Sequence, residues 1–435
     1  SAFEWALTLD GDNYQAVLHL ARMDMLSGQL KQSNKRLLQF IEQNHANIIL
    51  MLELGQNYLR LNEPANALTW FEKAYAQDRG NSKALSHLVD YHTKLNDTAK
   101  ALALVEEYLN RFNRDAEVQL MAADLYLKDK QNDKAMQAHQ LAVKHSREKG
   151  NALLALAKTQ ILFGDDDNAI TNLEKAITRD ETFVQAYLHL IEIYNTRQDF
   201  DNSLATIHAL EQVMPDRSLT FALKGESYRL NNQYSRAIEA FTQALSIKAS
   251  QRATLGLYRV YLAKEQYRQA IDLLEARIKE HPDDLLSAVA LADSYKARGD
   301  LVKAGRFYES LIERFPNAPV LFNNAAAIYL ALENFEKASQ YAEAAYARLP
   351  GNVAIIDTKA WVETRRGNYQ QALPLYRQAL ALDVDNIQVQ YHLAYTLSKM
   401  GRREEAVRYL QDVLASEQAF DGKNEAQALL KSLQQ

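Results

Sequence analysis

The 435-residue sequence has no cysteine and is poor in the two residues that most often interrupt helices. It contains 14 glycines and 7 prolines, where average usage would give roughly 30 and 22. The lack of cysteine excludes disulfide bonds and thiol catalysis. No hydrophobic run reaches the ~18 residues of a membrane-spanning helix. Because 47% of the residues are hydrophobic and 24% are charged, the chain is neither disordered nor collagen-like. The composition predicts a folded protein whose helices are seldom broken.

The charge balance argues against nucleic acid as the main partner. The sequence has 50 lysines and arginines and 55 aspartates and glutamates, which gives a net charge of −5. A protein that binds a phosphate backbone needs an excess of positive charge. We therefore expect no nucleic-acid partner.

One sequence pattern returns every 34 residues, except that the unit 218–250 is one residue short. It reads Gly55-x-x-Tyr58 with Ala67-x-x-x-Phe71 in one place, and Gly225-x-x-Tyr228 with Ala237-x-x-x-Phe241 in another. This register predicts twelve tandem repeats in residues 14–420, and positions within a repeat are counted from its first residue. These first residues are Tyr14, Ile48, Ser82, Ala116, Gly150, Val184, Ser218, Gln251, Leu285, Pro319, Val353 and Ile387.

Small residues recur at positions 8 and 20 of the repeats. Position 20 is alanine in ten of the twelve and serine, Ser33 or Ser203, in the other two. Two antiparallel helices come close only where the facing side chains are small, and a lone helix pair cannot bury its apolar stripe, so neighbouring repeats must stack. The pattern resembles the tetratricopeptide repeat (TPR) over nearly the whole chain. This resemblance implies an all-α fold, a right-handed superhelical α-solenoid of TPR helix-turn-helix repeats.

Both ends of the sequence differ from a complete repeat. Residues 1–13 match the second helix of a truncated TPR, with Phe3 at position 24 and Gly11 at position 32. We therefore expect further repeats upstream in a longer protein, since an array needs a polar cap at each end. Residues 421–435 are predicted to form a C-terminal capping helix.

The sequence contains no recognisable catalytic or cofactor motif. It lacks G-x-G-x-x-G, P-loop, G-x-S-x-G and H-E-x-x-H patterns, so we expect a protein that is not an enzyme and binds no cofactor or metal. Four histidines fall at position 6, but their repeats are never adjacent and they cannot share a metal ion. We assign structural roles to these residues, His19, His87, His189 and His392.

In TPR proteins the first helices line a groove that holds a peptide or helix, through positions 2, 5, 9, 12 and 13. The candidate groove residues of the middle repeats are the carboxylates Asp90, Asp124, Glu192, Glu226 and Asp293. Those of the last three repeats are Asn323, Asn324, Asp357, Trp361, Tyr391 and Tyr395. Their aromatic rings suit either a peptide anchor or the face of a sugar, and the alternative is that Trp361 and Tyr395 pack between repeats. No repeat carries the lysine and asparagine pair by which chaperone-binding TPR domains hold a C-terminal carboxylate.

The C-terminal segment resembles a narrower family. It shows Asp357-Thr358-x-x-Trp361, then Tyr391-His392-Leu393-Ala394, then Phe420 before a short helix. The TPR lipoproteins associated with the PEP-CTERM/exosortase system of Gram-negative bacteria have this succession, although Lys359-Ala360 replaces their usual leucine-glycine pair. The resemblance implies a periplasmic, membrane-anchored lipoprotein that acts near exopolysaccharide synthesis and export. Its lipid-bearing cysteine would lie upstream of residue 1.

Three functions follow from these resemblances. The leading hypothesis is a non-catalytic TPR scaffold that binds protein partners in a bacterial envelope assembly linked to exopolysaccharide export and PEP-CTERM/exosortase protein sorting. The second is direct binding of the exported polysaccharide by the C-terminal groove. The third is a recognition arm of a larger enzyme whose catalytic domain precedes residue 1.

Overall fold

The computed structural model describes residues 2–43, 47–147, 149–214, 216–416 and 418–435, and these contain helices and turns but no strand. The chain forms two compact units, residues 1–216 and 217–435, and each is described by itself. Among the described residues, no helix is both long enough and apolar enough to cross a bilayer.

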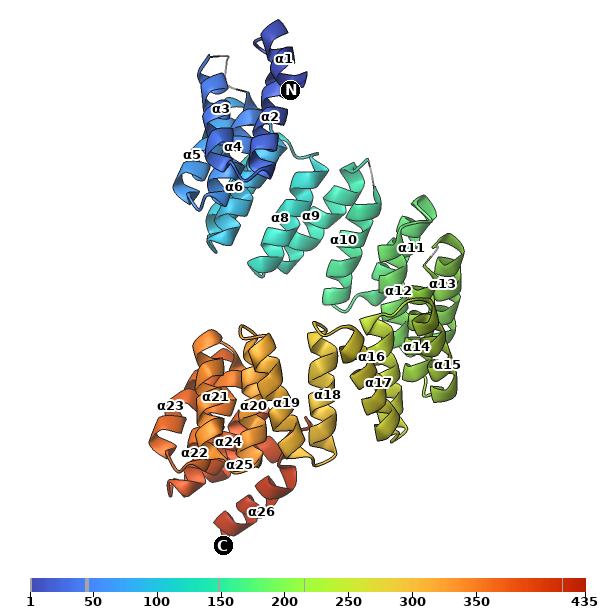
Figure 1. Cartoon of the computed structure of the whole chain (residues 1–435), viewed down its shortest axis with the longest axis vertical. Helices are drawn as coiled ribbons and strands as arrows, with labels where there is room; N and C mark the ends of the chain where they lie inside the picture. Colours follow the sequence, from blue (N-terminus) through green and yellow to red (C-terminus); the bar gives the residue numbers. More distant parts are fainter. Residues whose placement is uncertain (1, 44–46, 148, 215, 417) are drawn as a thin grey trace. The chain divides into compact units, whose positions relative to one another are not determined.

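The first compact unit contains α1 to α13 (Figure 1). Their bounds are α1 (Ala2–Leu9), α2 (Tyr14–Leu26), α3 (Leu30–Gln43), α4 (Ile48–Arg60), α5 (Pro64–Gln77), α6 (Ser82–Lys94), α7 (Thr98–Arg111), α8 (Ala116–Lys128), α9 (Asn132–His145), α10 (Lys149–Leu162), α11 (Asp166–Arg179), α12 (Val184–Thr196) and α13 (Phe200–Val213).

The second compact unit contains α14 to α26 (Figure 1). Their bounds are α14 (Arg217–Leu230), α15 (Tyr234–Ile247), α16 (Gln251–Ala263), α17 (Tyr267–Glu280), α18 (Leu285–Ala297), α19 (Leu301–Arg314), α20 (Pro319–Ala331), α21 (Phe335–Arg348), α22 (Val353–Arg365), α23 (Tyr369–Leu382), α24 (Ile387–Lys399), α25 (Arg403–Ala415) and α26 (Lys423–Gln434).

The helices alternate as the 34-residue pattern predicts. The even-numbered helices α2 to α24 begin at the predicted first residues of the repeats, except that α10 and α14 begin one residue earlier. Each is followed by an antiparallel odd-numbered partner, and within each compact unit the pairs stack in chain order. The predicted all-α architecture of stacked helix pairs is confirmed. The right-handed superhelix stays a prediction.

The turn inside each repeat requires one residue with left-handed backbone. This residue is always at position 15, and five repeats place glycine there, with φ between 76° and 85°. The other seven place a larger residue there, with φ between 56° and 62°. These seven residues are Asn62, Asn96, Lys130, Gln198, Asn232, Glu265 and Glu333. Glycine is scarce partly because a left-handed turn, which usually favours it, is more often made here without it.

Positions 8 and 20 lie where the two helices of a repeat approach most closely. All twelve residues at position 20 have 0% of their surface exposed, and all twelve at position 8 are buried. In the first repeat the Ser33 hydroxyl, at position 20, donates a 2.7 Å hydrogen bond to the carbonyl of Ala21, at position 8. Position 20 is alanine or serine in all twelve repeats, and a larger side chain there would force the helices apart.

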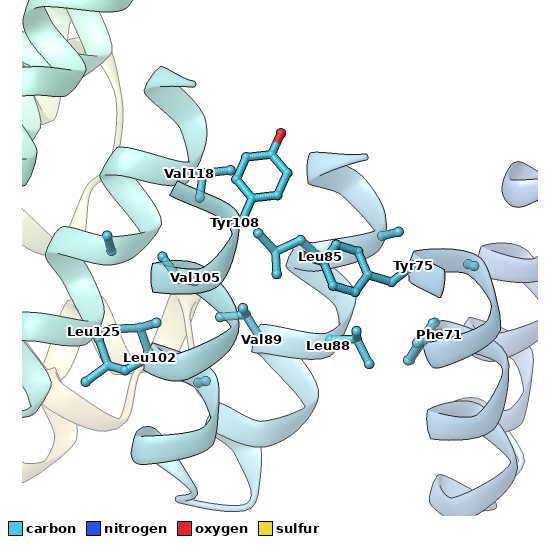
Figure 2. Packing of buried hydrophobic residues seen from close by; sticks show 14 of the residues in the cluster. Phe71, Tyr75, Leu85, Leu88, Val89, Leu102, Val105, Tyr108, Val118 and Leu125 are labelled. Atoms are coloured by element: carbon cyan, nitrogen blue, oxygen red, sulfur yellow. The ribbon is translucent and has the colours of Figure 1, made fainter. Parts of the chain in front are cut away.

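The hydrophobic core continues from one repeat to the next within a compact unit. Figure 2 shows one such cluster, in which Phe71 and Tyr75 of α5 pack with Leu85 of α6, Val105 of α7 and Val118 of α8. No helix pair buries its apolar face alone, which is the physical basis of a repeat array.

Both terminal helices pack on their neighbours. On α1, Phe3 stacks on His19 with ring centroids 4.8 Å apart; residue 1 lies outside the described residues. On α26, Ala426 is buried against Leu410 and Val413 of α25. The predicted boundaries of the partial repeat, the twelve repeats and the capping helix stay predictions.

A substitution of Gly225, at position 8, tests how closely the two helices of a repeat are packed. A methyl group at Gly225 would lie 2.8 Å from the ring of the buried Phe241. We expect Gly225→Ala to destabilise the second compact unit by about 1–3 kcal/mol, because the packed ring has no space to move into. Thermal unfolding followed by circular dichroism measures the effect. The control is Gly351→Ala, whose methyl group would meet nothing within 4 Å, and equal transition temperatures for the two variants would contradict the packing account.

Candidate functional site

The first helices keep one face open along each compact unit. Position 8 is buried in every repeat, whereas none of the twelve residues at the adjacent position 9 is buried. The position-9 residues are Arg22, Gln56, Asp90, Asp124, Lys158, Glu192, Glu226, Arg259, Asp293, Ala327, Trp361 and Tyr395. We call this surface the position-9 face. It contains seven of the eleven candidate groove residues.

The acidic candidates lie on this face in two different settings. Asp90, Asp124, Glu192 and Asp293 are exposed. Glu226 is half-buried and forms a 2.7 Å ion pair with Arg229 of its own helix. Burial favours a higher pKa for Glu226, but the hydrogen bonds and charge of Arg229 outweigh burial and lower the pKa overall. Glu226 is therefore already paired, while the other four carboxylates face solvent.

Two hollows open on the position-9 face, one in each compact unit. The first, of about 520 Å³, lies between α8, α9 and α10 and is lined by Asp124, His139 and Lys158 among others. The second, of about 540 Å³, lies between α18, α19 and α20 and is lined by Asp293 and Asn324 among others. Candidates predicted from the register alone thus line both hollows.

The second hollow satisfies its own polar groups. The buried Tyr308 hydroxyl donates to the Asp293 carboxylate at 2.8 Å, and the Asn324 amide donates to the Tyr308 oxygen at 3.1 Å. Burial and the nearby Asp293 charge raise the pKa of Tyr308 well above its ordinary value, so the phenol stays protonated. The neighbouring candidate Asn323 is half-buried, and its Oδ1 atom has no hydrogen-bond partner among the described residues.

Asp357 and His392 form a shielded pair between α22 and α24. His392 Nδ1 lies 2.9 and 3.0 Å from the two carboxylate oxygens of Asp357, and the side chains are only 11–12% exposed. The other ring nitrogen, Nε2, lies 2.9 Å from the Gln388 amide. A neutral imidazole that donates through Nδ1 and accepts through Nε2 satisfies both contacts. Gln388 also accepts from the backbone N–H of Asp421, so the pair connects to the segment before α26.

Trp361 and Tyr395 pack between consecutive repeats. The Trp361 ring is stacked on His392, with centroids 4.2 Å apart and an angle of 11° between the ring planes. The Tyr395 ring packs edge to face against the Trp361 ring, with the ring centroids 5.2 Å apart. These contacts favour the packing alternative over a free anchor, and the stacked imidazole leaves less ring surface for a sugar. Tyr391 is buried against Phe420, with 6% of its surface exposed, so it is a core residue and not part of the open surface.

Aromatic stacking accounts for three of the four histidines at position 6, while His189 faces Glu192 of its own helix. His19 stacks on Phe3, His87 on Phe71 and His392 on Trp361, each time against a residue of the preceding repeat. Sequence reasoning assigned these histidines structural roles but missed the hydrogen bond that ties His392 to Asp357. It also missed His139, a polar residue at position 24, where most repeats carry a hydrophobic side chain. In the described residues, no group of three or more His, Asp or Glu side chains is arranged to hold a metal ion.

The stability of Trp361→Ala tests the packing alternative. Because the ring bridges α22 and α24, we expect its loss to cost about 2–3 kcal/mol, which calorimetry would detect as a lower transition temperature. The control is Trp5→Ala on α1, since Trp5 is 66% exposed. If Trp361→Ala were as stable as Trp5→Ala, the stack would not support the repeat junction.

Comparisons with known proteins agree with the repeat assignment. Family models described as tetratricopeptide repeat match residues 58–125, 150–183, 228–292, 288–318 and 364–433, which together cover more than half of the chain. The resemblance to the PEP-CTERM/exosortase-associated lipoproteins stays a prediction. A comparison with curated proteins finds no match.

Two solved structures are similar over almost the whole chain. The crystal structure of yeast Tom70 has 16% sequence identity and a TM-score of 0.48, and the match covers 98% of this chain and 96% of that one. The crystal structure of the APC/C hetero-tetramer Cut9–Hcn1 has 15% identity and a TM-score of 0.43, and covers 99% and 98%. The helix pairs and the family matches together show that this chain is an all-α tetratricopeptide repeat protein.

Proposed function

We propose that this chain is a non-catalytic scaffold that binds protein partners along the position-9 face. The proposal rests on the contrast between two adjacent positions, of which position 8 is buried in every repeat and position 9 in none. A face that recurs at every repeat meets a partner segment at many small, evenly spaced points. Such a repeat solenoid is suited to protein–protein interaction.

Exposed carboxylates on the position-9 face favour partner segments that carry lysine or arginine. Asp90 is exposed and forms no ion pair within the described residues. Glu192 is 75% exposed and faces only His189 of its own helix, at 3.5 Å. Exposed charges of this kind contribute little to stability, but they attract and orient an oppositely charged partner.

We further propose that the partners belong to a bacterial envelope assembly linked to exopolysaccharide export and PEP-CTERM/exosortase protein sorting. A periplasmic location and a lipid anchor outside this sequence are part of the same proposal. Its support is the resemblance of the C-terminal segment, namely the Asp357 to Trp361 motif, the Tyr391 to Ala394 motif and Phe420.

Charge reversal on the position-9 face tests the scaffold proposal. We expect Asp90→Lys with Glu192→Lys to reduce partner recovery from the native organism by about tenfold, because the reversed charges repel a basic segment. The measurement is affinity purification with quantitative mass spectrometry, and higher salt should weaken wild-type recovery as well.

The matched control reverses two glutamates on second helices. Glu72 on α5 and Glu174 on α11 are exposed and share position 25 of their repeats. Glu72→Lys with Glu174→Lys changes the net charge equally but leaves the position-9 face intact. If the control lost the same partners to the same extent, binding would follow overall charge and not this face.

A further inference from the structure

Position 6 of one repeat reaches back to the preceding repeat and fills the space beside its position 9. His87 at position 6 stacks on Phe71 at position 24, with centroids 5.0 Å apart, and its Nδ1 lies 2.9 Å from the amide of Gln56 at position 9. His392 fills the corresponding space beside Trp361. In both cases a planar side chain occupies the junction and contacts position 9.

At the junction between α18, α19 and α20, where the 540 Å³ hollow opens, hydrogen bonds join the side chains at positions 6, 24 and 9. Asn324 at position 6 donates to Tyr308 at position 24, and Tyr308 donates to Asp293 at position 9. At this junction the aspartate at position 9, Asp293, accepts a 2.8 Å hydrogen bond from the phenol of Tyr308.

The junction between α8, α9 and α10 lacks the filling side chain. Position 6 of the following repeat is Ala155, whose methyl group is too short to reach across. The 520 Å³ hollow lies at this junction, with Asp124 and Lys158 at position 9 of the two adjoining repeats and the side chains of Leu127 and Leu154 as apolar walls.

His139 lines this hollow with an almost fully buried ring. It has 2% of its surface exposed, and among the described residues its Nδ1 atom has no hydrogen-bond partner. Burial lowers the pKa of His139 to about 4, so the ring is neutral near pH 7. Leucine occupies the same position 24 in other repeats, as Leu37 and Leu173, and would fill the core without an unpaired nitrogen.

We propose that this hollow, lined by Asp124, His139, Ala155 and Lys158, binds a tyrosine side chain of a protein partner. The phenol ring would take the place that His87 and His392 occupy at their junctions, and its hydroxyl would donate to Asp124 as Tyr308 does to Asp293. Lys158 disfavours a cationic side chain, and Asp124 disfavours a carboxylate. A tyrosine side chain has the planar ring, the hydroxyl donor and the absence of charge that this lining favours. The inference rests on the proposed scaffold function and names the side chain that one of its sites would recognise.

Binding of a single amino-acid derivative tests the proposal on the whole chain. The probe is N-acetyl-tyrosinamide, followed by methyl NMR at Leu127, Leu154 and Ala155, with N-acetyl-phenylalaninamide as the comparison. We expect saturable shifts at these methyl groups, with at least about fivefold tighter binding of the tyrosine probe. Equal binding of the two probes, or no shift up to the solubility limit, would overturn the proposal.

Two variants test whether the probe binds in this hollow and not elsewhere on the position-9 face. Ala155→His supplies the side chain found at position 6 of other repeats and should abolish the shifts; Ala290→His, at position 6 of another repeat, should not. Asp124→Ala should weaken binding of the tyrosine probe about tenfold, so that its affinity equals that of the phenylalanine probe. Unchanged tyrosine binding in either Ala155→His or Asp124→Ala would contradict the proposal.

The outcome is distinguishable from failure of the scaffold function. Tyrosine binding that persists while Asp90→Lys with Glu192→Lys leaves partner recovery unchanged would overturn the scaffold proposal alone. Loss of partners in that variant, without any tyrosine binding to the wild type, would overturn the pocket alone.

Discussion

The structure depends on the close approach of two helices at positions 8 and 20 of each repeat. Side chains at both positions are buried, those at position 20 are all alanine or serine, and in the first repeat a serine hydroxyl donates to the opposite backbone. This approach fixes which stripe of each helix faces its partner, and the 3.6-residue period of the helix then places position 9 on the open side. Burial at position 8 and exposure at position 9 are therefore two consequences of one constraint.

The side chain at position 6 varies between repeats, and it affects how the space between consecutive repeats is packed. Where position 6 is histidine, as in His87 and His392, the junction is filled from within the chain and contributes stability. At Ala155 the side chain at position 6 is only a methyl group, and the 520 Å³ hollow lies beside it. One scaffold thus combines junctions packed by aromatic side chains with junctions that keep a hollow.

The fold was predictable because its signal is repeated. Alanine occupies position 20 in ten of the twelve repeats, so the register is still clear where a single repeat departs from the pattern. The candidate site was predictable only in part. The register placed Asp124 and Asp293 on the open position-9 face, but it did not reveal that Tyr391 is buried against Phe420 or that His392 covers Trp361. Those outcomes depend on side chains from the next repeat, which a position read along one helix does not include.

The solvent accessibility of alanine methyl groups measures whether one close helix contact sets both the buried and the open face of each repeat. A soluble paramagnetic agent should leave Ala101 and Ala237, at position 20, almost unaffected, because both are 0% exposed. It should speed relaxation of Ala155 and Ala327, which are partly exposed on the open side, by several-fold. Equal relaxation at the two pairs of methyl groups would contradict the claim that one close helix approach sets both the buried and the open face.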